Sequence, residues 1–147
     1  MRADYYAINP DAIKAFSETK KSLKHIDAKL KSLLEIRISQ INGCAYCLDL
    51  HASEARHLGE LQQRLDCLAA WNESDLFTEA ECAAFAWAEA VTYISETRAP
   101  QKLYDDLAKH YSPEEIVDIT YVISFMNAWN RIAVSFSKHP TKRQKRD

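Results

Sequence analysis

Glycine and proline are scarce in this chain of 147 residues, which contains 2 and 4 of them. Because sheets and hairpins need many turn residues, this scarcity favours long helices joined by short loops. The chain also lacks any alternating polar and apolar stretch of useful length, which would be the pattern of a half-buried strand. We therefore predict an all-α fold, a bundle of six or seven helices.

An excess of charge of one sign and a long apolar run are missing as well. The formal net charge is −2, so the chain as a whole indicates no nucleic-acid or anionic-membrane partner. The most apolar stretch, residues 121–136, is interrupted by Asn127, Asn130 and Arg131, which makes it too polar and too short to span a membrane. The N-terminus lacks the apolar segment of a signal peptide. We expect a cytoplasmic protein.

The length favours one domain, because about two thirds of the unfolded surface of such a chain can be buried in a single core. We expect residues 1–147 to form that domain. A basic cluster lies between Lys138 and Arg146. Clusters of this kind at a chain end are usually solvated, so we expect residues 138–147 to form a flexible basic tail.

Helix starts are marked by residues that cap unpaired backbone groups. Asn9 precedes Pro10, and Thr78 stands three residues before Glu81, as in a capping box. The strongest start is Ser112-Pro113-Glu114-Glu115, with a serine cap, a proline and a glutamate at their preferred positions. Apolar residues at three- and four-residue steps predict the other helices, at about 27–41, 44–58, 61–71 and 100–107, with the last helix covering about 113–137. These steps place Leu61 and Val134 on buried faces.

The most informative stretch holds Cys44, Cys47 and His51 in the pattern C-x-x-C-x-x-x-H. Steps of three and four residues put the three side chains on one face of a helix. Asn42-Gly43 ends the preceding helix, and either residue can cap the next one. Both cysteines then lie near a helix N-terminus, where unpaired N–H groups and the helix dipole lower the pKa of a thiol. These are the parts of a dithiol redox centre.

Two other interpretations of the motif stay open, a metal site and inert core cysteines. A closed zinc site needs a fourth ligand, whereas Cys67 and Cys82 are unpaired in the sequence and fall on apolar faces. Covalent haem attachment needs a histidine directly after the second cysteine, where this chain has Leu48. A thioredoxin-like module needs a preceding strand. The dithiol interpretation is therefore favoured over the other two.

The stretch L-x-E-I-R-I-S-Q-I-N-G-C-A-Y-C-L-D-L-H-x-x-x-A-R-x-x-G-E resembles the alkylhydroperoxidase AhpD-like, carboxymuconolactone decarboxylase superfamily. The similarity is greatest to its small, single-domain AhpD-like branch and covers roughly residues 10–137. The resemblance implies an all-helical homo-oligomer, often a trimer or hexamer. It also implies an antioxidant peroxidase with peroxiredoxin activity, or a reductase partner of a peroxiredoxin. We expect no cofactor and no metal.

In the scheme that the resemblance implies, Cys47 attacks the hydroperoxide and becomes a sulfenic acid. Cys44 then closes the disulfide, an external dithiol reductant resets the pair, and His51 relays the proton. The family's decarboxylase members lack the cysteine pair, which argues against lactone decarboxylation. The alternative is a non-catalytic helical oligomer or a metal-binding protein that uses the same motif.

One position departs from the family pattern. A glutamate usually stands twelve residues before the first cysteine as the far end of the proton relay, and this chain has Ser32 there. Serine is no base at neutral pH, so another carboxylate is needed. Glu35, one helical turn later, and Glu81, in the capping box, are the candidates. The polar stripe of Asn127, Asn130 and Arg131 can serve a helix contact or the site itself.

Overall fold

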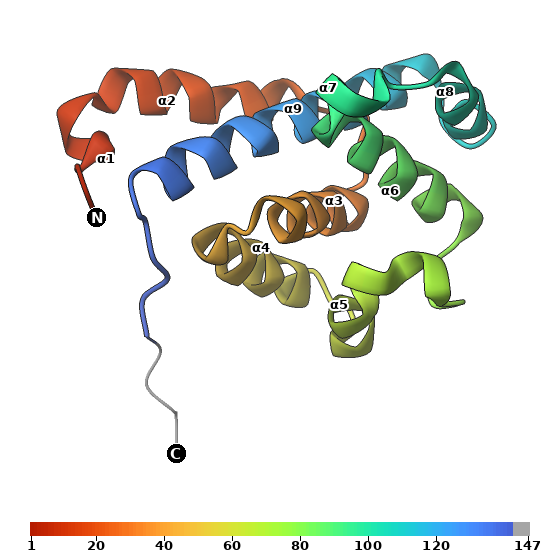
Figure 1. Ribbon diagram of the computed structural model, residues 1–147, viewed down its shortest axis with the longest axis horizontal. Helices are drawn as coiled ribbons and strands as arrows, with labels where there is room; N and C mark the ends of the chain where they lie inside the picture. Colours follow the sequence, from red (N-terminus) through yellow and green to blue (C-terminus); the bar gives the residue numbers. More distant parts are fainter. Residues whose placement is uncertain (143–147) are drawn as a thin grey trace.

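The structure is a computed structural model that describes residues 1–142, and within that range it is built of helices without a strand (Figure 1). This confirms the all-α prediction. The α-helices are, in chain order, α1 (Tyr5–Ile8), α2 (Pro10–Glu18), α3 (Ala28–Asn42), α4 (Ala45–His57), α5 (Gln62–Cys67), α6 (Glu79–Thr92), α7 (Ile94–Thr97), α8 (Gln101–Leu107) and α9 (Pro113–Ser135). Two 3₁₀-helices, η1 (Thr19–Ser22) and η2 (Leu68–Glu73), complete the set.

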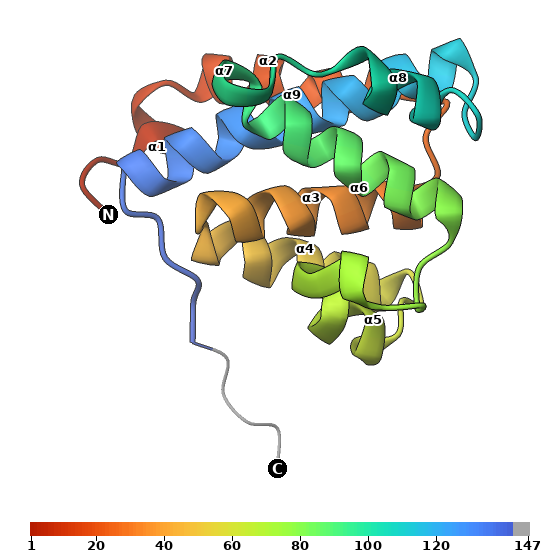
Figure 2. The same cartoon turned by 45° about the vertical axis from the view of Figure 1, so that its right-hand side comes forward.

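Helix α3 lies at the centre of the bundle, with α4, α6 and α9 packed around it (Figures 1 and 2). Its core side chains, Leu33, Leu34 and Ile38, are fully buried. The longest helix, α9, contributes Ile119 and Ile123 to the same core. Because α3 touches several other helices, a polar side chain on it can meet groups that are far apart in the sequence. Glu35 is one of these polar side chains on α3.

The number of helices exceeds the six or seven expected, because the described residues contain nine α-helices. Helices α1 and α7 are single turns, too short to show a period in the sequence. The segment 61–71, expected as one helix, is divided into α5 and η2, with non-helical dihedral angles at Ala70. The last helix ends at Ser135, two residues before the expected end, and Ser137 then takes a positive φ of 52°.

The caps predicted at Asn9, Thr78 and Ser112 are confirmed. The Asn9 side chain accepts a hydrogen bond from the backbone of Ala12. Both capping boxes, at Thr78 with Glu81 and at Ser112 with Glu115, have their two reciprocal hydrogen bonds. Two residues predicted to be buried are not, since Leu61 is 63% exposed and Val134 is 49% exposed. Leu61 is the residue before α5, where the helical period does not yet apply, and Val134 lies in the last turn of α9.

The first residues of the chain lie against the end of α9. The backbone N–H of Arg2 donates to the carbonyl of Phe136, with 2.8 Å between nitrogen and oxygen. Lys138, the first residue of the expected tail, packs its ammonium group over the rings of Tyr6 and Tyr46, 4.7 and 5.2 Å from their centroids. The rest of that tail from residue 143 lies outside the described residues. None of the helices in residues 1–142 is both long enough and apolar enough to cross a membrane.

Candidate active site

The cysteine motif sits at the turn that joins α3 to α4. Gly43 ends α3 with a φ of 65°, a left-handed conformation that glycine adopts without strain. Cys44 is the cap of α4, and its sulfur accepts a hydrogen bond from the backbone N–H of Cys47 at 3.4 Å. The expected cap at Asn42 or Gly43 was therefore wrong by one or two residues. Asn42 is still helical, and its side-chain amide donates hydrogen bonds to the side-chain oxygens of Asn127 and Asn130 on α9.

The two cysteines form a coupled pair that shares the positive end of α4. Both side chains are buried, and neither is in a disulfide. The hydrogen bond from the Cys47 thiol, with further help from the Cys47 backbone N–H, the Asn130 amide and His51, lowers the pKa of Cys44 to about 6 against burial. The same hydrogen bond, together with burial, raises the pKa of Cys47. The pair therefore releases its first proton easily and holds the second one tightly.

Asn130 on α9 lies against this pair. It is almost fully buried, its amide donates to the hydroxyl of Ser39 at 3.1 Å, and it favours the thiolate of both cysteines. Of the polar stripe on the last helix, Asn127 and Asn130 join the network around Asn42, whereas Arg131 is exposed and bonds Asn127. The stripe thus contains one residue that contacts the cysteine pair.

A cavity of about 180 Å³ opens next to the second cysteine of the pair. Cys47 and His51 line it, and Cys44 does not. The other walls are mainly aromatic and aliphatic, with Tyr5, Tyr46 and Trp129 among them. A small molecule in this cavity therefore meets the sulfur of Cys47 and the ring of His51, with Cys44 behind them.

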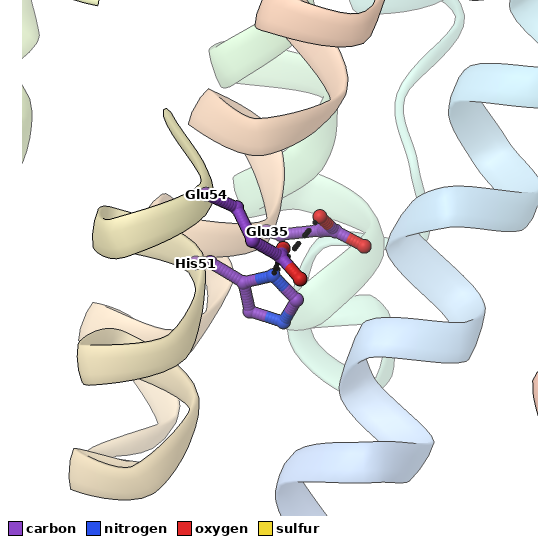
Figure 3. A group of neighbouring side chains, drawn as sticks. All are labelled: Glu35, His51 and Glu54. Atoms are coloured by element: carbon purple, nitrogen blue, oxygen red, sulfur yellow. Dashed lines mark hydrogen bonds and ion pairs between the residues drawn. The ribbon is translucent and has the colours of Figure 1, made fainter. Parts of the chain in front are cut away.

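His51 lies between two carboxylates, as Figure 3 shows. Its Nδ1 is 2.7 Å from Oε2 of Glu54 on the same helix and 3.1 Å from Oε2 of Glu35 on α3. The side chains of His51 and Glu35 are each only 3% exposed, whereas that of Glu54 is 49% exposed. One Nδ1–H makes one good hydrogen bond, here to Glu54, so the buried Oε2 of Glu35 keeps the ion-pair contact without a hydrogen bond of its own.

Glu35 is held as an anion by cations on its other oxygen. Nζ of Lys20 and Nζ of Lys31 lie 3.3 and 3.4 Å from its Oε1. Burial alone would raise the pKa of Glu35, but His51 and the two lysines outweigh it and lower the pKa to about 2. Ser32, at the family's usual relay position, only donates to the carbonyl of Ala28 in its own helix. The carboxylate that meets the histidine is thus one helical turn later than the family pattern.

The charge state of His51 follows from these neighbours. Burial by itself would lower the pKa of His51, but hydrogen bonds and charge from Glu35 and Glu54 raise it above its ordinary value. His51 is then an imidazolium over a wider pH range than a free histidine. The site in its reduced form holds one proton on the cysteine pair and one on each ring nitrogen of His51. The Nδ1 proton faces the carboxylates, and the Nε2 proton is the one available for exchange.

Glu81, the other candidate base, does not come to this cluster. Its carboxylate binds both terminal nitrogens of the Arg64 guanidinium and the backbone N–H of Thr78. Burial tends to raise the pKa of Glu81, and Arg64 with Thr78 more than reverses this. The hydrogen bonds of this carboxylate thus cap the start of α6 and join it to Arg64 on α5.

Metal ligation was the other interpretation of the motif. In residues 1–142, a group of three side chains with ligating atoms within 4.8 Å of one another is Glu35, His51 and Glu54, without a cysteine. Two lysines already neutralise the charge of Glu35, which weakens the attraction of this group for a cation. The donor set is therefore a poor match to a C-x-x-C-x-x-x-H zinc site.

Several site residues had no clear signal in the sequence. Glu54 follows His51 by three residues, a spacing that brings helical side chains together, but acidic residues at such spacings are common on exposed faces. Lys20 and Tyr5 reach the site from segments more than twenty residues before the motif. Only the tertiary structure, which places both side chains in the wall of the cavity beside Cys47, shows that they belong to it.

Comparison with known proteins gives a consistent result. A family model described as the carboxymuconolactone decarboxylase family matches residues 10–90. The uncharacterized protein YdfG of Bacillus subtilis is 41% identical over 136 residues, which is 91% of this chain and 92% of that protein.

Solved structures agree with the sequence match. A protein of unknown function from Agrobacterium tumefaciens, provisionally named an AhpD antioxidant defence protein, is 40% identical, with a TM-score of 0.92 over 96% of this chain and 99% of that one. The debrominase Bmp8 is 25% identical, with a TM-score of 0.78 over 92% of this chain and 74% of its own. The chain described here belongs to the carboxymuconolactone decarboxylase family and has the fold of its AhpD-like members.

Proposed function

We propose that this protein is an antioxidant dithiol peroxidase that reduces hydroperoxides through a disulfide cycle of Cys44 and Cys47. The observation that carries the proposal is the cavity whose wall holds both a cysteine of an acidic pair and an imidazolium. A peroxide needs a thiolate to attack one oxygen and an acid to protonate the other. Cys47 and His51 supply these two groups from adjacent turns of α4.

The oxidative half of the cycle can be written with every proton assigned. The Cys47 proton passes to the Cys44 thiolate, to which it is already hydrogen bonded. The Cys47 sulfur then attacks the terminal peroxide oxygen, the O–O bond breaks, and Cys47 becomes a sulfenic acid. The alkoxide that leaves takes the proton of His51 and departs as an alcohol.

The second step closes the disulfide and releases water. Cys44 passes its proton to the now neutral His51 and attacks the sulfur of Cys47. The S–O bond breaks, and the hydroxide that leaves takes the proton back from His51. An external dithiol then supplies two electrons and two protons, which restore the cysteine pair with its single proton and the imidazolium. A homo-oligomer and a dithiol reductant or peroxiredoxin partner are part of the proposal, as the family resemblance implies.

In this scheme Glu35 is a positioning residue. It touches no reacting atom, and it holds His51 as an imidazolium and orients its ring. Because Lys20 and Lys31 keep Glu35 ionised, the carboxylate does not take the proton away from His51. The proton that moves is thereby kept on the histidine, beside the cavity.

The experiment that tests the proposal is a thiol count after treatment with cumene hydroperoxide. We expect Cys44 and Cys47 to lose two free thiols together, while Cys67 and Cys82 stay reduced. The Cys44→Ser variant should stop at the sulfenic acid, which dimedone traps on Cys47, and Cys47→Ser should abolish peroxide reduction. A folded protein whose cysteine pair stays reduced in peroxide would refute the peroxidase and support the non-catalytic alternative.

A further inference from the structure

The walls of the cavity next to Cys47 divide into two kinds. His51, Lys20 and Ser17 provide polar groups. Apart from Cys47, the remaining wall consists of side chains that offer an apolar surface, four of them with a flat ring: Tyr5, Tyr6, Tyr46, Leu50, Met126, Trp129 and Ala133. Peroxide chemistry requires only the polar part, so the aromatic part has another use.

The size of the cavity suits more than hydrogen peroxide. A cavity of about 150 Å³ lined by apolar side chains is sufficient to bind benzene. The cavity here is about 180 Å³, which leaves room for one substituted ring beside the two reacting oxygens. A molecule as small as hydrogen peroxide would leave the aromatic wall in contact with water.

The aromatic wall is assembled with several contacts that hold its rings in place. The ring of Tyr5 stacks on Tyr6 at 4.6 Å between centroids and lies 5.3 Å from the ring of Phe136. The ring of Trp129 lies 4.7 Å from that of Phe16. Tyr5 is buried in this position although it belongs to a single turn near the start of the chain. Rings fixed in this way form a preorganised surface, which reduces the entropy lost when a ligand binds.

Two ammonium groups near the cavity already have partners. Nζ of Lys20 pairs with Glu35, and Nζ of Lys138 lies over the rings of Tyr6 and Tyr46. Burial raises the pKa of Tyr5 and of Tyr46, so both phenols stay neutral. A ligand in this cavity therefore does not need a charge, and a neutral ring fits the surface best.

We propose that this cavity is a binding site for a neutral compound with a single aromatic ring, and that the substrate class of the enzyme is the aromatic hydroperoxide. The ring lies against Tyr5, Tyr46 and Trp129, and the peroxide group faces Cys47 and His51. Tyr5 and Tyr46 are specificity-determining residues. The substrate part of this inference rests on the proposed peroxidase function, whereas the binding part does not.

The turnover test compares cumene hydroperoxide, tert-butyl hydroperoxide and hydrogen peroxide with the full-length protein and an excess of an external dithiol. We expect kcat/KM for cumene hydroperoxide to exceed the value for hydrogen peroxide at least about tenfold, with tert-butyl hydroperoxide between them. In Tyr5→Ala this ratio should fall about tenfold, as expected for one lost ring contact, and Tyr5→Phe should keep it. Tyr121→Ala is the matched control, because its ring is exposed on α9 outside this cavity.

The binding test uses cumyl alcohol, the product of cumene hydroperoxide, with the Cys47→Ser variant, in which no peroxide chemistry takes place. We expect calorimetry to show one site that Tyr5→Ala and Tyr46→Ala both weaken and Tyr121→Ala leaves unchanged. Absence of binding, or equal kcat/KM for all three peroxides, would overturn the inference. Binding of the alcohol by a protein whose thiols resist every peroxide would support the site and refute the proposed function, so the two failures are distinguishable.

Discussion

Two ionic clusters in this molecule are built around a glutamate, and they differ in whether a proton can move within them. Glu35 on α3 faces two lysines and a histidine, and its neighbour Glu54 shares the same histidine. Glu81 on α6 faces Arg64, which is also bound by Glu60. Both carboxylates have a lowered pKa, so the pKa of the glutamate alone does not separate the two clusters.

The partner cation makes the difference. Arg64 keeps its proton at any pH of interest, and Glu81 raises the pKa of Arg64 further. That cluster therefore fixes geometry, as its hydrogen bond from Arg64 to the carbonyl of Leu76 shows. An imidazolium, unlike a guanidinium, can release its proton, and His51 lines a cavity, so the same kind of ion pair there controls a proton. A buried glutamate indicates a relay only when its partner can release a proton.

The largest expected difference between the clusters is in turnover. Glu35→Gln removes a charge that raises the pKa of His51, so less imidazolium remains to protonate the leaving alkoxide. We expect kcat for cumene hydroperoxide to fall about 10³-fold, within the range of general acid catalysis. Glu81→Gln should change kcat less than about twofold, because its cluster holds no mobile proton.

The pH profile separates loss of the relay from loss of structure. Because the pKa of His51 is raised in the native protein, the acid form is present at low pH and disappears as the pH rises through that value. In Glu35→Gln the rate should decline at a lower pH than in the native protein. An unshifted profile with a lower rate would mean that Glu35 has only a structural part.

The second largest effect is on stability in acid. The pKa of Glu35 falls from 4.5 to about 2 on folding, so its ionisation stabilises the folded state above pH 4.5. This contribution, about 3 kcal/mol, is lost as the pH falls from 4.5 towards 2. Urea unfolding at neutral and acid pH should show a smaller loss in Glu35→Gln than in the native protein. An equal loss in both proteins would contradict the low pKa.

Local signals in the sequence were sufficient for much of this picture. The capping boxes at Thr78 and Ser112 depend on residues three apart, and both were predicted correctly. The shared face of Cys44, Cys47 and His51 also follows from helical spacing alone. Helices α1 and α7 were missed because one turn shows no period.

The rest of the site depends on tertiary packing. Glu35 meets His51 because the chain reverses between α3 and α4 at Gly43. In this packing Glu35 faces the histidine, whereas Ser32 bonds its own helix. Tyr5 shares the cavity wall with Cys47, and the first residues of the chain are hydrogen bonded to the end of α9. No pattern in the sequence relates these segments, so the aromatic cavity was not predicted.

The third largest effect should be a loss of stability when the Glu81 cluster is broken. Glu81→Ala removes half of the capping box and the main partner of Arg64. We expect the free energy of unfolding at neutral pH to fall by about 1–2 kcal/mol, a typical cost for a lost helix cap. Glu79→Ala is a suitable control, since Glu79 lies in the same first turn but is not part of the box. Equal losses in the two variants would show that the Glu81 cluster adds nothing beyond charge at the helix start.

The smallest effect should come from Glu54, the exposed partner of His51. Its hydrogen bond to Nδ1 is shorter than the contact made by Glu35, yet solvent screens its charge because the side chain is half exposed. In Glu54→Gln the Nδ1–H can turn to the buried oxygen of Glu35, which has no hydrogen bond in the native protein. We therefore expect kcat to fall only about two- to fivefold, with the pH profile displaced less than in Glu35→Gln. If Glu54→Gln proved as damaging as Glu35→Gln, the shorter hydrogen bond, rather than burial, would determine which carboxylate controls the proton.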